Sequence, residues 1–64
     1  MIRQGHTYKT WAIDAPLIAI ERHGDMGVWR MREIVGEWLG APHFVFPEDA
    51  EPLPMKYFKG EVPA

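Results

Sequence analysis

The stretch from residue 28 to residue 39 most constrains the fold, because its apolar side chains can be sorted by two different periods. It reads Val-Trp-Arg-Met-Arg-Glu-Ile-Val-Gly-Glu-Trp-Leu. At about 100° per residue the stretch separates into one apolar arc without charges and one polar arc. The apolar arc contains Val28, Met31, Ile34, Val35, Trp38 and Leu39. This period predicts an amphipathic helix that packs its apolar face against a sheet.

Both ends of this predicted helix carry typical boundary residues. Asp25 is a good N-cap, and Gly40 can take the left-handed position after the last turn, with Pro42 just beyond it. Against the helix, Gly27 and Gly36 each cost up to about 1 kcal/mol relative to alanine in a helix interior. Because boundaries and periodicity agree, the helix is our first interpretation.

The same stretch can also be interpreted as a strand. In this alternative a hairpin at residues 24–27 leads into a third strand over residues 28–35. A period of two then leaves neither face clean, because one face carries Glu33 and the other carries Arg30 and Arg32.

Two short segments, one at the end of this stretch and one after it, favour an all-β alternative. The run Gly36-Glu37-Trp38-Leu39-Gly40, followed by Phe44-Val45-Phe46-Pro47, resembles the Trp-rich strand and the Phe-Pro step of small SH3-like barrels. The acidic loop and the paired aromatic residues of that family are not found here. The resemblance implies a small SH3-like barrel as the alternative fold and does not carry a binding groove over.

The remaining segments predict a small antiparallel sheet. Residues 6–13 and 17–22 are rich in strand-forming types, and Asp14-Ala15-Pro16 predicts a turn between them. Residues 43–46 predict a third strand, and residues 47–51 a single helical turn that begins with a proline. Residues 55–59 are expected to form an edge strand and residues 61–64 a frayed tail.

Together these patterns predict one α+β domain over residues 1–64. A small antiparallel sheet packs against one amphipathic helix in the order ββαβ, with the all-β SH3-like barrel as the alternative. The sheet is expected to add its own apolar side chains to the core that the helix face begins. These side chains are Trp11, Leu17, Ile18 or Ile20, Phe44 and Phe46.

The chain has 64 residues and lacks Cys, Ser and Asn altogether. A domain of this size buries only about 60% of its unfolded surface, so its core supplies little net stability. Without cysteine there is neither a disulfide nor a thiolate zinc site, and without serine or cysteine the common nucleophiles are missing. We therefore expect no enzyme and no cofactor, and we expect association with a partner or with itself as a homo-oligomer.

Charge and hydropathy narrow the classes of partner. Seven Lys and Arg against nine Asp and Glu give a net charge of -2, which offers no basic footprint for nucleic acid. No apolar run reaches the roughly 18 to 20 residues of a membrane span, and the first residues lack the apolar stretch of a signal peptide. Nucleic acid and membranes are therefore disfavoured, and the cytoplasm is the expected location.

Histidines and carboxylates offer weak signals for chemistry. His6, His23 and His43 are not at helical ligand spacing and fall at the ends of predicted elements. Glu33 and Glu37 lie one helical turn apart on a predicted solvent face, where the pKa of a general acid would not be raised. The sequence therefore predicts neither a metal site nor carboxylate catalysis.

One feature of the predicted helix points to a function. Trp29, Arg32 and Gly36 form a stripe away from the apolar arc, with Glu33 beside it. Tryptophan and arginine are frequent interface hot spots, and a glycine lets another backbone come close. We predict that these four residues bind a partner protein. The alternative is that Trp29 belongs to the core, where it folds back over the sheet edge or covers Tyr57 or Phe58, with Gly36 making room.

The predicted function is a non-enzymatic protein-protein interaction module, a small regulator or inhibitor that binds a larger protein or itself. Chains this short are often accessory proteins of phages or mobile elements, an association that adds to this expectation. The alternative is a weak nucleic-acid binder that uses exposed aromatic rings for stacking together with scattered basic residues. These basic residues are Arg3, Lys9, Arg22, Arg30 and Arg32.

Overall fold

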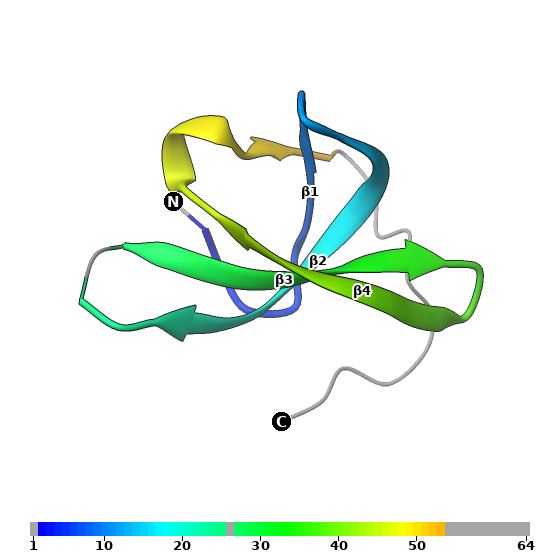
Figure 1. The fold of residues 1–64 in the computed structure, drawn as a ribbon, viewed down its shortest axis with the longest axis horizontal. Coiled ribbons are helices and arrows are strands. Elements are labelled where there is room, and N and C mark those ends of the chain that lie inside the picture. Colours follow the sequence, from blue (N-terminus) through cyan, green and yellow to red (C-terminus); the bar gives the residue numbers. More distant parts are fainter. Residues whose placement is uncertain (1, 26, 54–64) are drawn as a thin grey trace.

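The computed structural model describes residues 2–25 and 27–53, which form one antiparallel sheet (Figure 1). The order in the sheet is β4-β3-β2-β1-β5. A short 3-10 helix, η1, lies between the last two strands. The bounds are β1 Thr7–Thr10, β2 Ile13–His23, β3 Val28–Val35, β4 Trp38–Val45, η1 Pro47–Asp49 and β5 Glu51–Pro52. The strand expected at residues 55–59 and the tail expected at 61–64 lie outside the described residues.

The predicted α+β class with the order ββαβ is wrong, because residues 28–35 form a strand. This strand, β3, pairs with β2 on one side and with β4 on the other. Across residues 2–25 and 27–53 there is no α-helix. The structure supports the all-β alternative, in which a hairpin at residues 24–27 joins the second and third strands.

Cross-strand partners explain why β3 tolerates charges on both of its faces. Arg30 forms an ion pair with Glu21 on β2, with 3.1 Å between Nη2 and Oε1. On the opposite face Glu33 binds His43 on β4. A period of two in the sequence makes these charges look misplaced in a strand, because the period contains no information about the neighbouring strands.

Irregular pairing bends the sheet at three places. In β2, residues 14–16 form extra length opposite Lys9, and Ile20 is an extra residue between the pairs made by Ala19 and Glu21. In β4, residues 40 and 41 together oppose Glu33. Such bulges bend strands and increase their twist. Figure 1 shows the result, in which β1 runs across the direction of β3 and β4.

The turn expected at Asp14-Ala15-Pro16 is wrong, because these residues lie inside β2. The chain turns earlier, at Trp11 and Ala12. Pro16 lies in the irregular part of the β1–β2 pairing, where its missing N–H group interrupts no regular ladder. Two strands with a short connection were predicted correctly, but the position of the connection was not.

The core occupies both faces of the central strand β2. One cluster gathers around Leu17, Ala19 and Met31, and the other consists of Ile18, Ile20 and Ile34. The cluster of Leu17 is completed by Ile2, Tyr8 and Val45. The segment before β1 also binds β2, because the Gly5 N–H donates to the Ala19 carbonyl at 2.8 Å.

The core prediction is confirmed at the middle of the sheet and wrong at its ends. Leu17, Ile18, Ile20, Met31 and Ile34 are buried as expected. Five large apolar residues that were expected inside are exposed. They are Trp11, Val35, Trp38, Phe44 and Phe46. Each lies in a turn, beside a turn or at the end of β4, where a strand has no second layer to cover it.

Candidate binding surface

The four residues predicted to bind a partner do not share one surface in the structure. Period-two alternation places Trp29 and Glu33 on the face of β3 that carries Met31, and Arg32 on the opposite face. Gly36 lies beyond the strand, in the turn to β4. The stripe depended on a helical period, so it disappears with the helix.

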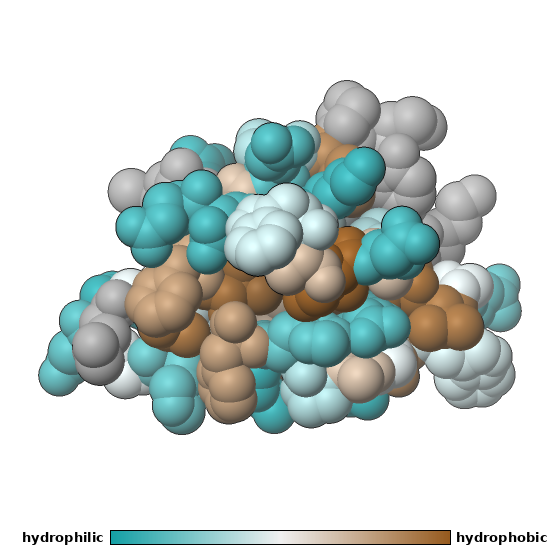
Figure 2. Space-filling view, turned by 45° about the horizontal axis from the view of Figure 1, so that its top comes forward, coloured by the Kyte–Doolittle hydropathy of each residue, from teal (hydrophilic) through white to brown (hydrophobic). Residues whose placement is uncertain are grey.

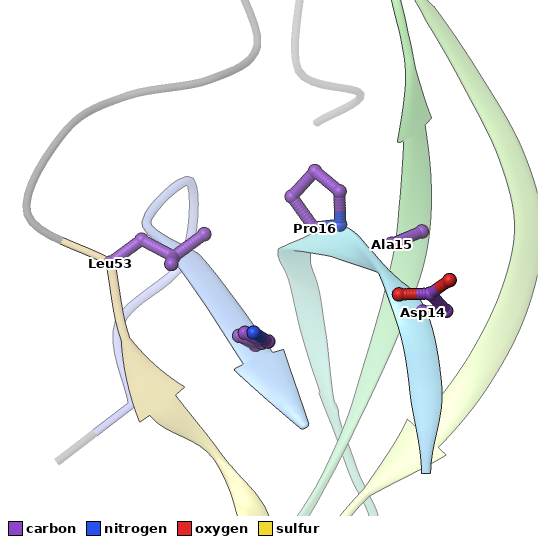
Figure 3. Close-up of a pocket in the computed structure, with 5 residues that line it drawn as sticks. Asp14, Ala15, Pro16 and Leu53 are labelled. Carbon is purple, nitrogen blue, oxygen red and sulfur yellow. The ribbon is translucent and has the colours of Figure 1, made fainter. Parts of the chain in front are cut away.

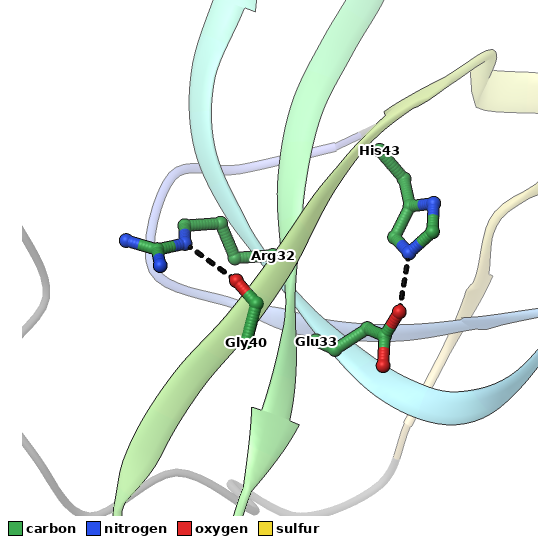
Figure 4. A network of polar contacts seen from close by, with 4 residues as sticks. All are labelled: Arg32, Glu33, Gly40 and His43. Atoms are coloured by element: carbon green, nitrogen blue, oxygen red, sulfur yellow. Dashed lines mark hydrogen bonds and ion pairs between the residues drawn. The ribbon is translucent and has the colours of Figure 1, made fainter.

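Arg32 is bound within its own sheet. Its Nε donates to the Gly40 carbonyl at 2.9 Å, and its Nη2 donates to the Leu39 carbonyl at 3.1 Å. Figure 4 shows the first of these bonds crossing from β3 to β4. Both carbonyls belong to β4 at or next to its bulge, so the guanidinium links β3 to β4 by charged hydrogen bonds to the backbone.

Glu33 and His43 form the second polar contact in Figure 4. The distance from His43 Nε2 to Glu33 Oε2 is 2.5 Å, and both side chains are partly buried. A histidine oriented by a carboxylate is one half of a nucleophile-activating arrangement. Because the sequence has neither serine nor cysteine, this pair is better explained as a link between β3 and β4.

The other two predicted residues have local structural roles. Gly36 has a φ of 62° and follows Val35, which pairs with Trp38 across a two-residue turn. A positive φ at the first central residue is typical of a II′ hairpin turn and favours glycine there. Trp29 is partly buried and packs against the core cluster around Met31. Its packing fits the interpretation in which this tryptophan covers the core.

Exposed aromatic side chains gather at another place, which the sequence had assigned to the core. Trp11, Phe44 and Phe46 are 86%, 61% and 44% exposed. Together with Asp49 they line a shallow cavity of about 90 Å³. We name these four residues the Trp11 surface. Figure 2 brings the β1–β2 turn and η1 forward and shows hydrophobic side chains exposed between hydrophilic ones on this side.

Local sequence explains how the Trp11 surface forms. Trp11 is in the turn between β1 and β2, and most of its side chain is exposed. Phe44 and Phe46 flank Val45, which packs into the cluster of Leu17, so alternation directs both rings away from that cluster. Pro47 then begins η1, and the Asp49 N–H donates back to the Phe46 carbonyl at 3.0 Å. The aspartate is thereby held next to the aromatic rings.

The wall of this cavity also contains a buried polar group. Thr10 is only 5% exposed, and its Oγ1 has no hydrogen-bond partner among the described residues. Buried hydroxyl groups usually have a partner, because an unpaired one costs free energy. The ring of Phe44 contacts that of His23, with 4.7 Å between the two ring centroids.

A second cavity, of about 260 Å³, lies where the β1–β2 pairing is irregular (Figure 3). Its lining combines opposite charges, from Lys9 and Asp14, with the apolar side chains of Ala15, Pro16 and Leu53. In Figure 3 the cavity is bordered by the side chain of Pro16, which is in β2, and by that of Leu53, which directly follows β5. Lys9 and Asp14 are the only ionisable residues in this lining, and two such groups do not make a set of metal ligands.

The sequence contained one signal that could have located the Trp11 surface. Phe44 and Phe46 are two residues apart, so in a strand they share a face, and Val45 between them must face the other way. Only one of the two faces can be buried at the end of a small sheet. The prediction assigned both phenylalanines to the core because aromatic residues usually dominate small cores.

The chain matches no family model, no curated protein and no solved structure. Within residues 2–25 and 27–53, no three His, Cys, Asp or Glu side chains are grouped so that they could hold a metal ion. No helix in this part of the chain has the length and apolar character needed to cross a membrane. The chemistry of the Trp11 surface is therefore the main guide to function.

Proposed function

We propose that the protein is a non-enzymatic interaction module whose Trp11 surface binds a short segment of a partner protein. In this proposal it acts as a small regulator or inhibitor in the cytoplasm. The observation that supports it is the gathering of three exposed aromatic rings around one shallow cavity. Exposed apolar side chains that occur singly need no explanation, but a group of them on a small domain commonly marks an interaction site.

The size and shape of the cavity favour a protein segment over a free small molecule. Small-molecule sites generally occupy about 300 Å³ or more and enclose most of their ligand. The cavity below Trp11 is about 90 Å³, which accommodates the end of one side chain. Aromatic residues are enriched among interface hot spots, where each anchors one group of the partner.

The distribution of charge favours protein over nucleic acid. Single-stranded nucleic acid requires aromatic rings beside a positively charged groove. Here the ionisable residue in the cavity lining is Asp49, and Glu48 lies next to it in η1. Two arginines are already bound elsewhere, Arg30 by Glu21 and Arg32 by backbone carbonyls. A phosphate chain stacked on these rings would therefore meet carboxylates.

The test begins with selection of random twelve-residue peptides displayed on phage against the full chain. Selected peptides are then measured against Trp11→Ala and against Trp38→Ala, which serves as the matched control because Trp38 is also 76% exposed. We expect Trp11→Ala to weaken binding at least tenfold, as for a hot-spot tryptophan, and Trp38→Ala to change it less than twofold. Thermal unfolding checks that both variants remain folded.

Other outcomes would overturn the proposal in distinguishable ways. Equal losses in the two variants would show that any exposed tryptophan binds these peptides nonspecifically. Binding of a labelled oligothymidine that depends on Trp11 and weakens with salt would favour the nucleic-acid alternative. A concentration-dependent dimer that dissociates on Trp11→Ala would show that the surface binds a second copy of the chain instead.

A further inference from the structure

From the Trp11 surface we infer a cation site: the cavity receives the positively charged end of a lysine or arginine side chain of the partner. This inference rests on the proposed function and specifies the chemistry of the group that is bound. It follows from the combination of three exposed aromatic rings with one carboxylate around a space of about 90 Å³.

The carboxylate is the first element of the site. Asp49 lies in the cavity lining, and its side chain has no ion pair with any residue of the described ranges. The lining contains no lysine, arginine or histidine that could neutralise it. A ligand that enters this cavity therefore meets a negative charge, which attracts a cation and repels a phosphate or a carboxylate.

The aromatic rings are the second element. The face of an aromatic ring is electrostatically negative, and tryptophan attracts cations more strongly than tyrosine or phenylalanine does. Trp11, Phe44 and Phe46 are exposed enough for a ligand to approach them, and they border the same space as Asp49. A purely apolar side chain could contact these rings but would place an apolar group beside Asp49. A cation satisfies both elements.

Within residues 2–25 and 27–53, no lysine, arginine or histidine lines this cavity. Arg30 is held by Glu21, and Arg32 by the carbonyls of Leu39 and Gly40. Lys9 belongs to the lining of the other cavity. The attraction for positive charge is therefore left for a group from outside the described part of the chain.

The experiment uses peptides selected for binding through Trp11 and replaces each of their Lys or Arg residues in turn by norleucine, an uncharged residue of similar length. We expect one such replacement to weaken binding to the wild-type chain about fivefold, as for a cation lying over an exposed aromatic ring beside a carboxylate. Asp49→Asn should reduce this preference for the charged residue to less than twofold. Glu48→Gln is the matched control, because Glu48 neighbours Asp49 without lining the cavity, and it should preserve the preference.

A direct probe supplements the peptides. Lysine amide should shift the indole N–H signal of Trp11 in a nitrogen-15 spectrum, whereas norleucine amide at the same concentration should not. If peptides require Trp11 but bind equally well with norleucine, the cation site is wrong and the proposed function remains. If no selected peptide requires Trp11, both fail together.

Discussion

Two tryptophans, Trp11 and Trp38, are exposed to a similar degree on this small sheet, yet their surroundings differ. Trp11 lies beside Phe44, Phe46 and Asp49 around a cavity. Trp38 lies at the tip of the β3–β4 hairpin, where it pairs across the turn with Val35, which is also exposed. The cavity linings described for the sheet do not include Trp38.

This difference shows that two tryptophans of similar exposure can have very different chemical surroundings. Val35 and Trp38 offer exposed apolar surface at the tip of a hairpin, but neither of them lines either of the two cavities described above. The surroundings of Trp11 add a concave surface and a carboxylate, and these are the features that allow one ligand to be distinguished from another. The following substitutions test whether the two regions are separable.

The largest effect is expected for Leu17→Ala, which shortens a side chain in the core on which the whole sheet depends. Leu17 is fully buried at the centre of the core. Leucine-to-alanine changes at such positions cost about 2 to 5 kcal/mol, a large part of the stability of a domain this small. Circular dichroism should show a much lower unfolding midpoint, and peptide binding should be lost together with the fold. A midpoint within a few degrees of wild type would contradict the assigned core.

Arg32→Met should affect the Trp38 region and spare the Trp11 surface. The substitution removes the two hydrogen bonds to the carbonyls of Leu39 and Gly40 while keeping an apolar stem. Hydrogen bonds from a charged group contribute about 1 to 3 kcal/mol, so chemical denaturation should show a loss in that range.

The control for this change is Arg22→Met, at an exposed position of β2. It should alter stability by less than about 0.5 kcal/mol. Peptide affinity should be unchanged in both variants when they are measured below their unfolding midpoints. A selective loss of affinity in Arg32→Met would show that the β3–β4 hairpin and the Trp11 surface are coupled.

The smallest effect is expected for Thr10→Val beneath the Trp11 surface. The hydroxyl is buried without a described partner, and valine has nearly the same shape and favours strands. Stability should stay constant or rise by up to about 1 kcal/mol. Thr10→Ser, which keeps the hydroxyl and removes the buried methyl group, should instead lower it. If Thr10→Val is clearly destabilised, the hydroxyl has a partner in solution.

Much of the chain organisation could be predicted from sequence. The antiparallel pairing of β2 with β3, the strand over Val28–Val35 and a helical turn beginning at Pro47 were all predicted, the first two as the alternative. The choice between helix and strand failed because it depended on partners from other strands. Arg30 and Glu33 argue against a strand until Glu21 and His43 are placed beside them.

The candidate site was harder to predict than the fold. In Phe44-Val45-Phe46 the spacing shows which side chains share a face, but which face is buried depends on where the sheet ends and on the position of Met31 in the next strand. Trp11 was expected inside because its turn was placed three residues too late, at Asp14-Ala15-Pro16 rather than at Trp11-Ala12. Both errors arose because the sequence does not show which distant segments contact each other in the fold.

The outermost strands of the described sheet each contain a proline, Pro42 in β4 and Pro52 in β5. A proline has no amide hydrogen to offer to a neighbouring chain, and β5 is only two residues long. The borders of the sheet are therefore poor templates for extending it with foreign backbone. We therefore expect a partner to contact side chains on the faces and turns of the sheet rather than the backbone at its edges.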